Sequence, residues 1–378
     1  MNRGFYLTLM VGGFNASPVP QTVIDALTEV EVHTSVGVQG GFQLKFTWGK
    51  NSALAQLHAS GFFDPRQRVI IAVTVNGSTD VLMDGVITKQ DLAPSHQAGK
   101  STLSITGLDL TAIMDFIDLT GIPYPAMPKF AIVALILAKY LPLGVVPVVI
   151  PTAIPDVQLP TEGYPQHRGT DYQFIQELGK KGKTGWLFQL IPGPKPGMSI
   201  AYWGPDFSRL FGGSQPALSI NLDAITNIES ISFSYDGTLA TQYLLTILED
   251  EIGFPIPVPI PNIDIFQTSL AARSPTPLKS EQIQLGEANF RFPEAAEWAL
   301  KKLFETSNVV SGSGSLDVLR YGQVFKMQQI CQVRGAGDFY DGEYYVRGVT
   351  HNIKRGEYKQ TFTLSRGGPG STISRVSG

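Results

Sequence analysis

The chain has 378 residues, which is enough for two or more domains with substantial cores, and only 16% of its residues are charged. A formal net charge of −3 gives no support to nucleic-acid binding, and the single cysteine, Cys331, excludes a disulfide framework and a cysteine metal cluster. The 39 glycines and 26 prolines are typical of a β-rich protein with many turns.

The first hundred residues predict a series of strands. Met1–Met10 has too short an apolar run for a signal peptide, so we expect it to contain the first strand. Phe42–Trp48 alternates, with its aromatic and leucine side chains on one face. Arg68–Val75 is a continuous apolar strand, and Asn76-Gly77 directly after it is the sequence of a tight hairpin turn.

The next hundred residues combine helices with strands. Gly107–Phe116 predicts a short helix that leaves the first group of strands, and the prolines from Pro123 to Pro128 predict an extended linker. Lys129–Leu141 predicts an apolar helix. Prolines, a glycine and a lysine interrupt the longer apolar stretch Phe130–Pro151, which argues against a membrane-spanning segment.

A stronger helix signal follows at Thr170. Thr170 and Gln173 have the spacing of a capping box, and Phe174, Ile175 and Leu178 form an apolar stripe behind it. Two apolar strands come next, at Trp186–Ile191 and Ser199–Trp203. Together these elements predict an α/β unit of about one hundred residues, an ordinary size for a small domain.

The second half of the chain begins with a strand at Ile225–Tyr235. Proline at alternate positions of Phe254–Pro261 predicts a polyproline-type strap. Pro293–Phe304 predicts a helix, with proline in the first turn and an apolar stripe. Ser311–Ser315 alternates serine with glycine, and we expect a flexible turn there.

The C-terminal segment has the clearest pattern of the chain. Tyr344–Thr350 and Tyr358–Leu364 predict two strands of a hairpin, with Lys354-Arg355-Gly356 as the turn. In the second strand Tyr358, Gln360, Phe362 and Leu364 share one face. Lysine, threonine and serine occupy the other face, so the strand is predicted to be half-buried.

A similar pattern lies near the N-terminus. Val81–Thr88 can be aligned with Tyr344–His351, which places Gly85 on Gly348 and Val86 on Val349. Two antiparallel meanders can resemble each other by chance, and an internal duplication of one small barrel is the other explanation. The pattern alone leaves both open.

The sequence contains no catalytic, cofactor-binding or metal-binding constellation. None of the five histidines (His33, His58, His96, His167 and His351) has a histidine three or four positions away, the spacing of a helical metal pair. His351 lies in a predicted strand, where a structural role is favoured. Asp206 with Asp223, or Glu249-Asp250-Glu251, could form a glycosidase pair only if they meet in space, and solvated turns are the better interpretation.

Four segments, in this order and spacing, resemble the phage late control protein D family, which is similar to the hub portion of the type VI secretion spike protein. They are Phe42–Phe46, Phe63–Val69 with Asp84–Thr88, His167–Leu178, and Gly342–Arg366. The resemblance implies a mainly β fold with an α+β insert, built from two related small antiparallel β-barrels of the tail-tube type and an inserted α/β domain.

The expected division is a first barrel at 1–115, the inserted α/β domain at 116–224, a second barrel at 225–250 and 316–367, an insertion with a proline-rich strap and a helix at 251–315, and a C-terminal tail at 368–378. Because the chain stops at Ser377-Gly378, without the β-helix of spike fusions, the resemblance implies a separate spike protein.

The function that the resemblance implies is that of a structural baseplate hub in a contractile injection machine. Three copies would form a pseudo-sixfold ring between the hexameric tail tube and the spike, in contact with other baseplate proteins, without cofactor, metal, nucleic-acid specificity or membrane insertion. The protein would be made in the bacterial cytoplasm and assembled into a phage tail or phage-like particle. The alternatives are a peptidoglycan- or glycan-cleaving baseplate enzyme and a carbohydrate-binding β protein.

Overall fold

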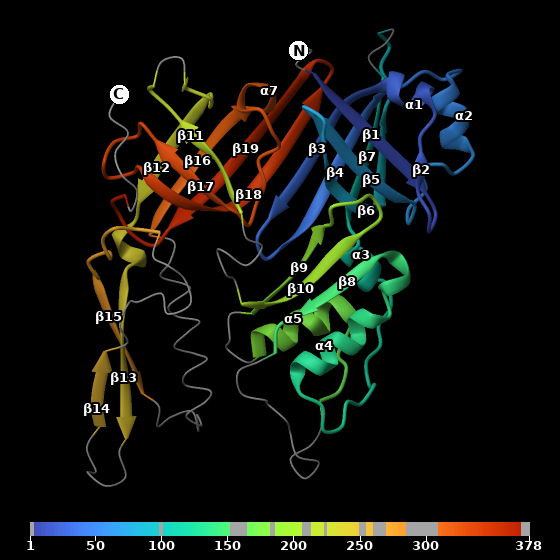
Figure 1. Ribbon diagram of the computed structural model, residues 1–378. Helices are drawn as coiled ribbons and strands as arrows, with labels where there is room; N and C mark the ends of the chain where they lie inside the picture. Colours follow the sequence, from blue (N-terminus) through green and yellow to red (C-terminus); the bar gives the residue numbers. More distant parts are fainter. Residues whose placement is uncertain are drawn as a thin grey trace.

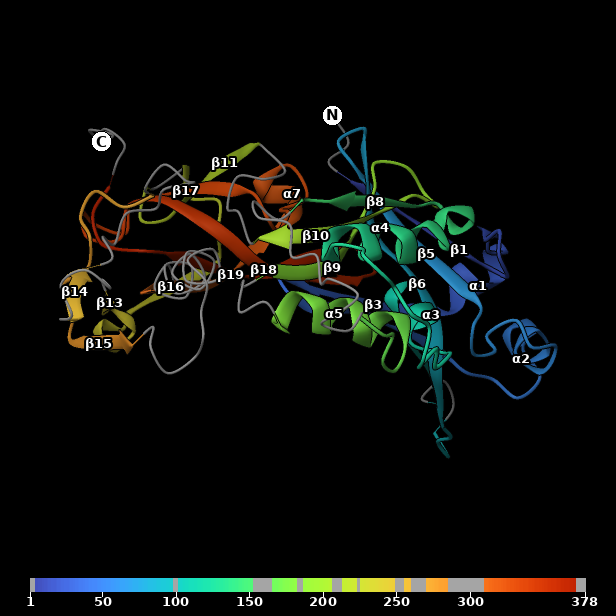
Figure 2. The same ribbon diagram turned by 90° about the horizontal axis from the view of Figure 1, so that it is seen from below.

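The computed structural model describes residues 4–97, 101–151, 165–181, 186–205, 213–222, 225–248, 255–259, 270–284 and 309–371. A large sheet forms the upper part of the molecule in Figure 1, and a smaller unit with helices lies below its N-terminal half. Figure 2 shows the same smaller unit from below, and a further small sheet lies away from it, toward the other end of the molecule. Mostly antiparallel β-structure with an α/β insert confirms the expected fold class.

The N-terminal half of the large sheet contains six principal strands, called here the first strand set. They are β1 (Phe5–Gly12), β3 (Leu27–Ser35), β4 (Val38–Thr47), β5 (Arg68–Val75), β6 (Ser78–Ala93) and β7 (Thr102–Asp109). A two-residue strand, β2 (Ser17–Pro18), and two short helices, α1 (Gln21–Ala26) and α2 (Ala53–Ala59), complete this half. Asn76 and Gly77 both have positive φ at the β5–β6 turn, as the sequence predicts for a tight hairpin.

The other half contains the second strand set. Its strands are β11 (Ser214–Ser219), β12 (Ser230–Tyr235), β16 (Val310–Asp317), β17 (Ile330–Arg334), β18 (Gly342–Lys354) and β19 (Glu357–Arg366), with the short helix α7 (Val318–Tyr321) after β16. Among the described residues, the first set has the spatial order β1-β5-β6-β7-β4-β3 and the second the order β11-β17-β18-β19-β16-β12. If the six strands of each set are numbered 1 to 6 along the chain, both sets have the spatial order 1-4-5-6-3-2. One difference is that β1 is antiparallel to β5 whereas β11 is parallel to β17.

The two sets are joined into one continuous sheet, which the sequence does not reveal. The second half of β18 pairs with β3, from Gly348 opposite Ser35 to Lys354 opposite Glu29. We call this pairing the β18–β3 joint. Buried side chains from both sets belong to one hydrophobic core, so the joint is covered on its inner face.

The alignment of Gly85 with Gly348 is wrong, and the β-bulges show why. Within the described ladders, β6 has a register shift after Ile87 and β18 has one after Val346. The carbonyl of Ile87 accepts from the N–H of Arg66, and that of Val346 accepts from Gln328. Arg66 and Gln328 also share a positive φ.

When the two strands are aligned at their bulges, Ile87 is equivalent to Val346 and Lys89 is equivalent to Gly348. The counterpart of Gly348 is therefore four positions further along β6 than the predicted Gly85. A glycine-valine match cannot fix the register of a strand. A bulge can, because it leaves one residue unpaired at a defined point of the ladder.

The inserted unit has its own three-stranded sheet and core. It contains α3 (Thr111–Met114), α4 (Lys129–Ala138), a 3₁₀ turn at Leu141–Leu143, β8 (Val145–Val149), α5 (Asp171–Lys181), β9 (Trp186–Pro192) and β10 (Ser199–Pro205). Here β10 lies between β8, which is parallel to it, and β9, which is antiparallel. The predicted capping box is confirmed, because the N–H of Gln173 donates to the Thr170 hydroxyl and the N–H of Thr170 donates to the Gln173 side chain.

A third sheet lies at the far end of the second strand set. It consists of β13 (Thr241–Leu248), β14 (Pro255–Pro259) and β15 (Lys279–Gln284). The predicted polyproline strap is thus an edge strand over Pro255–Pro259, paired with β13. Proline is tolerated at an edge wherever the missing N–H would have pointed away from the neighbouring strand.

The predicted flexible turn at Ser311–Ser315 is wrong, because these residues form most of β16. The glycines make room for aromatic rings: a Cβ on Gly314 would lie 2.7 Å from the Phe362 ring, and one on Gly312 would lie 3.0 Å from Phe233. The serines point the opposite way. The alternation therefore marks a strand with one face packed against rings and the other in water.

The strand pairing also differs from the expected domain ranges in three places. β11 was expected in the insert but pairs with β17, and β16 begins before residue 316. β13 falls in the expected second barrel but pairs with β14 and β15. The predicted helix Pro293–Phe304 lies outside the described residues, and in the part of the chain that is described no helix has the length and apolar character to cross a membrane.

Candidate assembly surface

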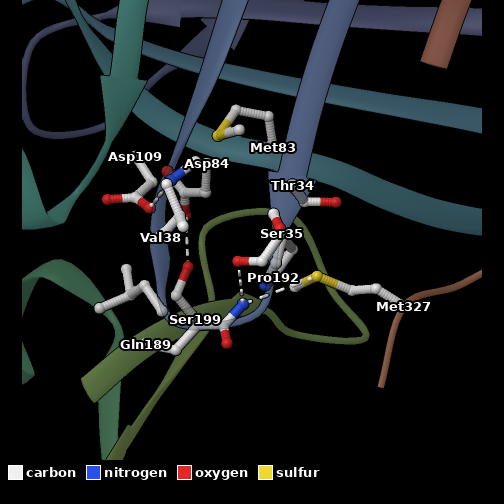
Figure 3. A pocket seen from close by; sticks show the side chains of 12 residues that line it. Thr34, Ser35, Val38, Met83, Asp84, Asp109, Gln189, Pro192, Ser199 and Met327 are labelled. Atoms are coloured by element: carbon white, nitrogen blue, oxygen red, sulfur yellow. Dashed lines mark hydrogen bonds between the residues drawn. The ribbon is translucent and has the colours of Figure 1, made fainter. Parts of the chain in front are cut away.

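A buried ion pair connects the first strand set to the inserted unit. Arg68 on β5 donates from Nε and Nη2 to the two carboxylate oxygens of Asp84 on β6, at 2.7 and 2.6 Å. The same guanidinium donates to the carbonyls of Leu143 and Gly197, both in the inserted unit. Asp84 also accepts from the hydroxyl of Ser199 on β10, a contact drawn in Figure 3.

Asp109 lies in the same junction. Burial raises the pKa of its carboxyl to about 6, although hydrogen bonds from Thr111 and from the N–H of Gly40 oppose the shift. The cavity that these groups surround in Figure 3 has a volume of only about 10 Å³. That is about the space of one water molecule, so these carboxylates hold two units together and have no room for a sugar.

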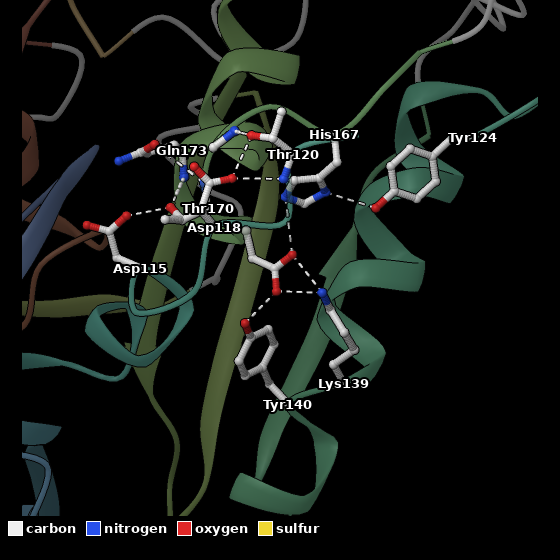
Figure 4. A network of polar contacts seen from close by, with 11 residues as sticks. Asp115, Asp118, Thr120, Tyr124, Lys139, Tyr140, His167, Thr170 and Gln173 are labelled. Carbon is white, nitrogen blue, oxygen red and sulfur yellow. Dashed lines mark hydrogen bonds and ion pairs between the residues drawn. The ribbon is translucent and has the colours of Figure 1, made fainter. Parts of the chain in front are cut away.

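A second polar cluster lies inside the inserted unit (Figure 4). Asp171 at the start of α5 accepts from Lys139 at 2.6 Å and from the Tyr140 hydroxyl at 2.6 Å. His167 is buried, and its Nδ1 lies 3.0 Å from the Tyr124 hydroxyl. Burial lowers the pKa of His167, so its ring is neutral at pH 7. The cluster fixes the start of α5 against α4.

The remaining candidates for chemistry do not meet. His351 is buried in the main core beside the Tyr358 hydroxyl, and burial lowers its pKa to about 3, in keeping with a structural role. His33 is exposed on the sheet, and His58 on α2 contacts Gln90. Within the described ranges, no three histidine, cysteine or acidic side chains could hold a metal ion. Asp206, Asp223 and residues 249–251 lie outside those ranges.

One face of the large sheet is mostly polar and, among the described residues, exposed over much of its area, and we call it the polar face. Across β12, β16, β19, β18 and β3 it carries mainly hydroxyl side chains. They are Ser230, Ser232, Ser234, Ser311, Ser313, Ser315, Thr361, Thr363, Thr350 and Ser35. Neighbouring strands are linked through them, for example by the Ser230–Ser315 contact of 2.9 Å and the His33–Thr350 contact of 2.9 Å. This part of the face forms a hollow of about 590 Å³.

Charges on the polar face gather toward the β18–β19 turn, and they alternate. Lys354 lies opposite Glu29 across the β18–β3 joint, and Glu29 lies opposite Lys45 on β4. Lys45 and Glu29 form an ion pair at 2.8 Å, and the hydrogen bond from Lys45 is the main cause of a lowered Glu29 pKa. Lys359 pairs with Glu229 at 2.8 Å. Lys354, Lys45 and Lys359 therefore each lie beside a carboxylate.

Among the described residues, the unpaired edges of the sheet include β12 and part of β6. β12 ends the strand order on one side, and among the described residues its only strand partner is β16. In β6, the residues that pair with β5 stop at Val86, so Lys89–Ala93 pairs with β7 alone. An unpaired edge offers a row of backbone N–H and C=O groups to another chain. In the sequence, the serine rows are indicated only by the period-2 alternation in β12 and β16.

No family model matches the chain, and no curated protein sequence is significantly similar to it. Its fold does match solved structures. A tail protein from Neisseria meningitidis MC58 superposes with a TM-score of 0.61 at 13% identity, over 96% of this chain and 97% of that one. The 43 kDa tail protein of prophage MuSo2 from Shewanella oneidensis gives 0.58 at 13% identity, over 96% and 98%.

A third match extends to a secretion machine. It is an Escherichia coli protein described as a component of the type VI secretion system with structural similarity to bacteriophage T4 tail proteins. It superposes with a TM-score of 0.52 at 13% identity, over 90% of this chain and 73% of that one. The chain therefore has a fold similar to that of these phage tail proteins and of this secretion component.

Proposed function

We propose that this chain is the structural hub of a contractile injection machine, in which three copies form a ring with pseudo-sixfold symmetry between a hexameric tail tube and a spike. The observation that carries the proposal is the repeated order of six strands, which gives each chain two like units. A ring of three chains with two like units each presents six like faces, and only then can it meet a sixfold tube through equivalent contacts.

In this proposal the two strand sets are copies of one unit. The first copy is residues 1–115, and the α/β unit follows it. The second copy consists of β11, β12 and β16–β19. The equal strand order and the equivalent bulges at residues 88 and 347 support a duplication over a chance likeness of two meanders.

The polar face is the proposed wall of the channel. It is the side of the sheet opposite the core, and its hydroxyl groups and paired charges suit a surface that stays in water. The tube, the spike and further baseplate proteins are the proposed partners, and a phage tail or phage-like particle is the proposed location. The three matched structures, two of them tail proteins and one a secretion component, support this choice of machine.

The proposal is tested by the copy number and symmetry of the purified assembly. Native mass spectrometry is expected to give three copies, and two-dimensional electron-microscopy averages are expected to show a ring with six similar lobes and a central channel. Binding to the hexameric tube protein, measured by co-sedimentation, should require this ring. A ring of another order, or a chain that stays monomeric at micromolar concentration, would contradict the proposal.

We also expect no hydrolysis of cell-wall material. The buried carboxylates Asp84 and Asp109 surround a cavity of about 10 Å³, too small for a sugar ring, and Asp84 is neutralised by Arg68. A zymogram with embedded peptidoglycan should therefore remain uncleared under the protein band, beside a lysozyme control that clears it. Clearing that disappears when one aspartate or glutamate is replaced would point to the hydrolase alternative.

A further inference from the structure

We propose that the open half of β6 in one copy pairs with β12 of the next copy, antiparallel, and that this ladder repeats between chains the β18–β3 joint found within each chain. The inference rests on the ring proposed above and specifies its subunit contact. It names the two strands that meet and the residues that lie opposite one another.

The two strand sets have equivalent positions. Matched at their bulges, β6 is the counterpart of β18, and β12 is the counterpart of β3 because both end the same strand order. Within the chain, β18 of the second set pairs with β3 of the first set. The counterpart contact would join β6 of the first set to β12 of a second set. Both edges are unpaired within the described residues, and in the proposed ring another copy of the chain supplies this contact.

The register follows from three ladders. Lys89 is equivalent to Gly348, as shown above. Lys89 and Gly348 face Thr106 on β7 and Thr363 on β19, so these two threonines are equivalent. Gln43 on β4 faces Thr106, and Ser313 on β16 faces Thr363, so Gln43 is equivalent to Ser313.

Glu31 faces Gln43 and Ser232 faces Ser313, so Glu31 corresponds to Ser232. Counting along each segment, Ser35 then corresponds to Asp236, the extended residue directly after β12. Since Gly348 faces Ser35 in the joint, Lys89 of one copy is placed opposite Asp236 of the next.

The chemistry of the facing residues fits this register. In the single chain Lys89 pairs with Asp91 at 2.7 Å and the Asp236 carboxylate accepts from Thr238. In the ladder Lys89 and Asp236 would face each other, and opposite charges across neighbouring strands stabilise a ladder whereas like charges destabilise it. Asp91 lies opposite Ser234, where the carboxylate can accept from the hydroxyl, as Thr350 and His33 contact each other in the joint.

The apolar pair in this register is Leu92 with Phe233. Leu92 is 44% exposed although its counterpart, His351, is buried in the core. Phe233 is half-buried and already stacks on Tyr340. Placing Leu92 against Phe233 would cover an apolar side chain that the single chain leaves in water.

The side-chain geometry also identifies the best positions for a cross-link. The N–H of Val36 donates to the carbonyl of Arg347, so residues 347 and 36 form a hydrogen-bonded pair. Hydrogen-bonded and non-hydrogen-bonded pairs alternate along an antiparallel ladder. Thr350 and His33 are therefore a non-hydrogen-bonded pair, and so are their counterparts, Asp91 and Ser234. Side chains are closest in such pairs, at a Cβ separation of about 4.5 Å, near the range that a disulfide requires.

The test is disulfide trapping in the full chain. Asp91→Cys with Ser234→Cys is expected to give, after oxidation, linked species of up to three copies on a non-reducing gel. Asp91→Cys with Ser232→Cys, shifted by two positions on the same face, is the matched control and should link far less. The native Cys331 is fully buried and does not compete. Native mass spectrometry of the wild-type chain and of both reduced variants measures assembly separately.

The outcomes distinguish the two proposals. If native mass spectrometry gives three copies but residues 91 and 234 do not cross-link, or the control links equally well, the β6–β12 ladder is overturned. The proposed ring is then unaffected. A wild-type chain that does not assemble overturns the ring and this inference with it. If the cysteine variants fail to assemble, a charge exchange decides. Lys89→Glu should weaken association about tenfold, and adding Asp236→Lys should restore it. No rescue would contradict the register.

Discussion

Replacing Arg68 with methionine is expected to lower the free energy of unfolding by about 3–5 kcal/mol, measured by chemical denaturation of the full chain. The substitution keeps much of the side-chain volume but leaves the carboxylate of Asp84 buried without its cation. It also removes the donors to the carbonyls of Leu143 and Gly197. The loss is larger than for a surface pair because neither charge can return to water while the protein stays folded: the side chains of Arg68 and Asp84 are 7% and 0% exposed.

Lys359→Met provides the matched control. It breaks the ion pair with Glu229 on the polar face, where the two side chains are 41% and 34% exposed, and should cost less than about 1 kcal/mol. A double variant, Arg68→Met with Asp84→Leu, should recover part of the loss, because no buried charge is then left alone. Equal effects of Arg68→Met and Lys359→Met would show that the buried pair does not hold the junction.

The second large effect is expected for Leu178→Asp. Leu178 is buried on α5 and belongs to the core of the inserted unit, together with Phe174 and Ile175. The change removes an apolar contact and buries a carboxylate in the apolar core of the unit. Because a buried charge is costly, we expect this unit to lose a few kcal/mol of stability. The signal is a lower midpoint of thermal unfolding and increased protease cleavage within residues 116–205.

Leu178→Met is the control for that experiment. It keeps the volume and the apolar character of the site and should cost less than about 1.5 kcal/mol. A Leu178→Asp protein with an unchanged unfolding midpoint and normal assembly would show that the stripe on α5 is not buried.

Local patterns in the sequence predicted the elements that are fixed by local physics. The C-terminal hairpin has the predicted turn and the predicted alternation, with Tyr358, Phe362 and Leu364 buried and Thr361 and Thr363 exposed. The start of α5 was predicted because a capping box satisfies backbone N–H groups within a few residues of one another. Such signals need no knowledge of the rest of the chain.

The features that the sequence did not reveal depend on distant partners. Ser311–Ser315 has the composition of a flexible turn, and only the rings of Phe233 and Phe362 make its glycines suitable for a strand. The pairing of β18 with β3 involves residues from the two ends of the chain, so no window of sequence contains it. The polar face could not be located for the same reason, since it consists of single exposed rows from five strands.

The β18–β3 joint also has a consequence for how the protein is made. During synthesis the N-terminal strands emerge first, but β3 cannot complete its pairing until β18, almost the last strand, has left the ribosome. Contacts between such distant segments form slowly because a long loop must close first. Until then β3 is an uncovered strand edge, open to pairing with other nascent chains. A chaperone that shields β3 during translation would therefore raise the yield of folded subunits more than one that acts after release.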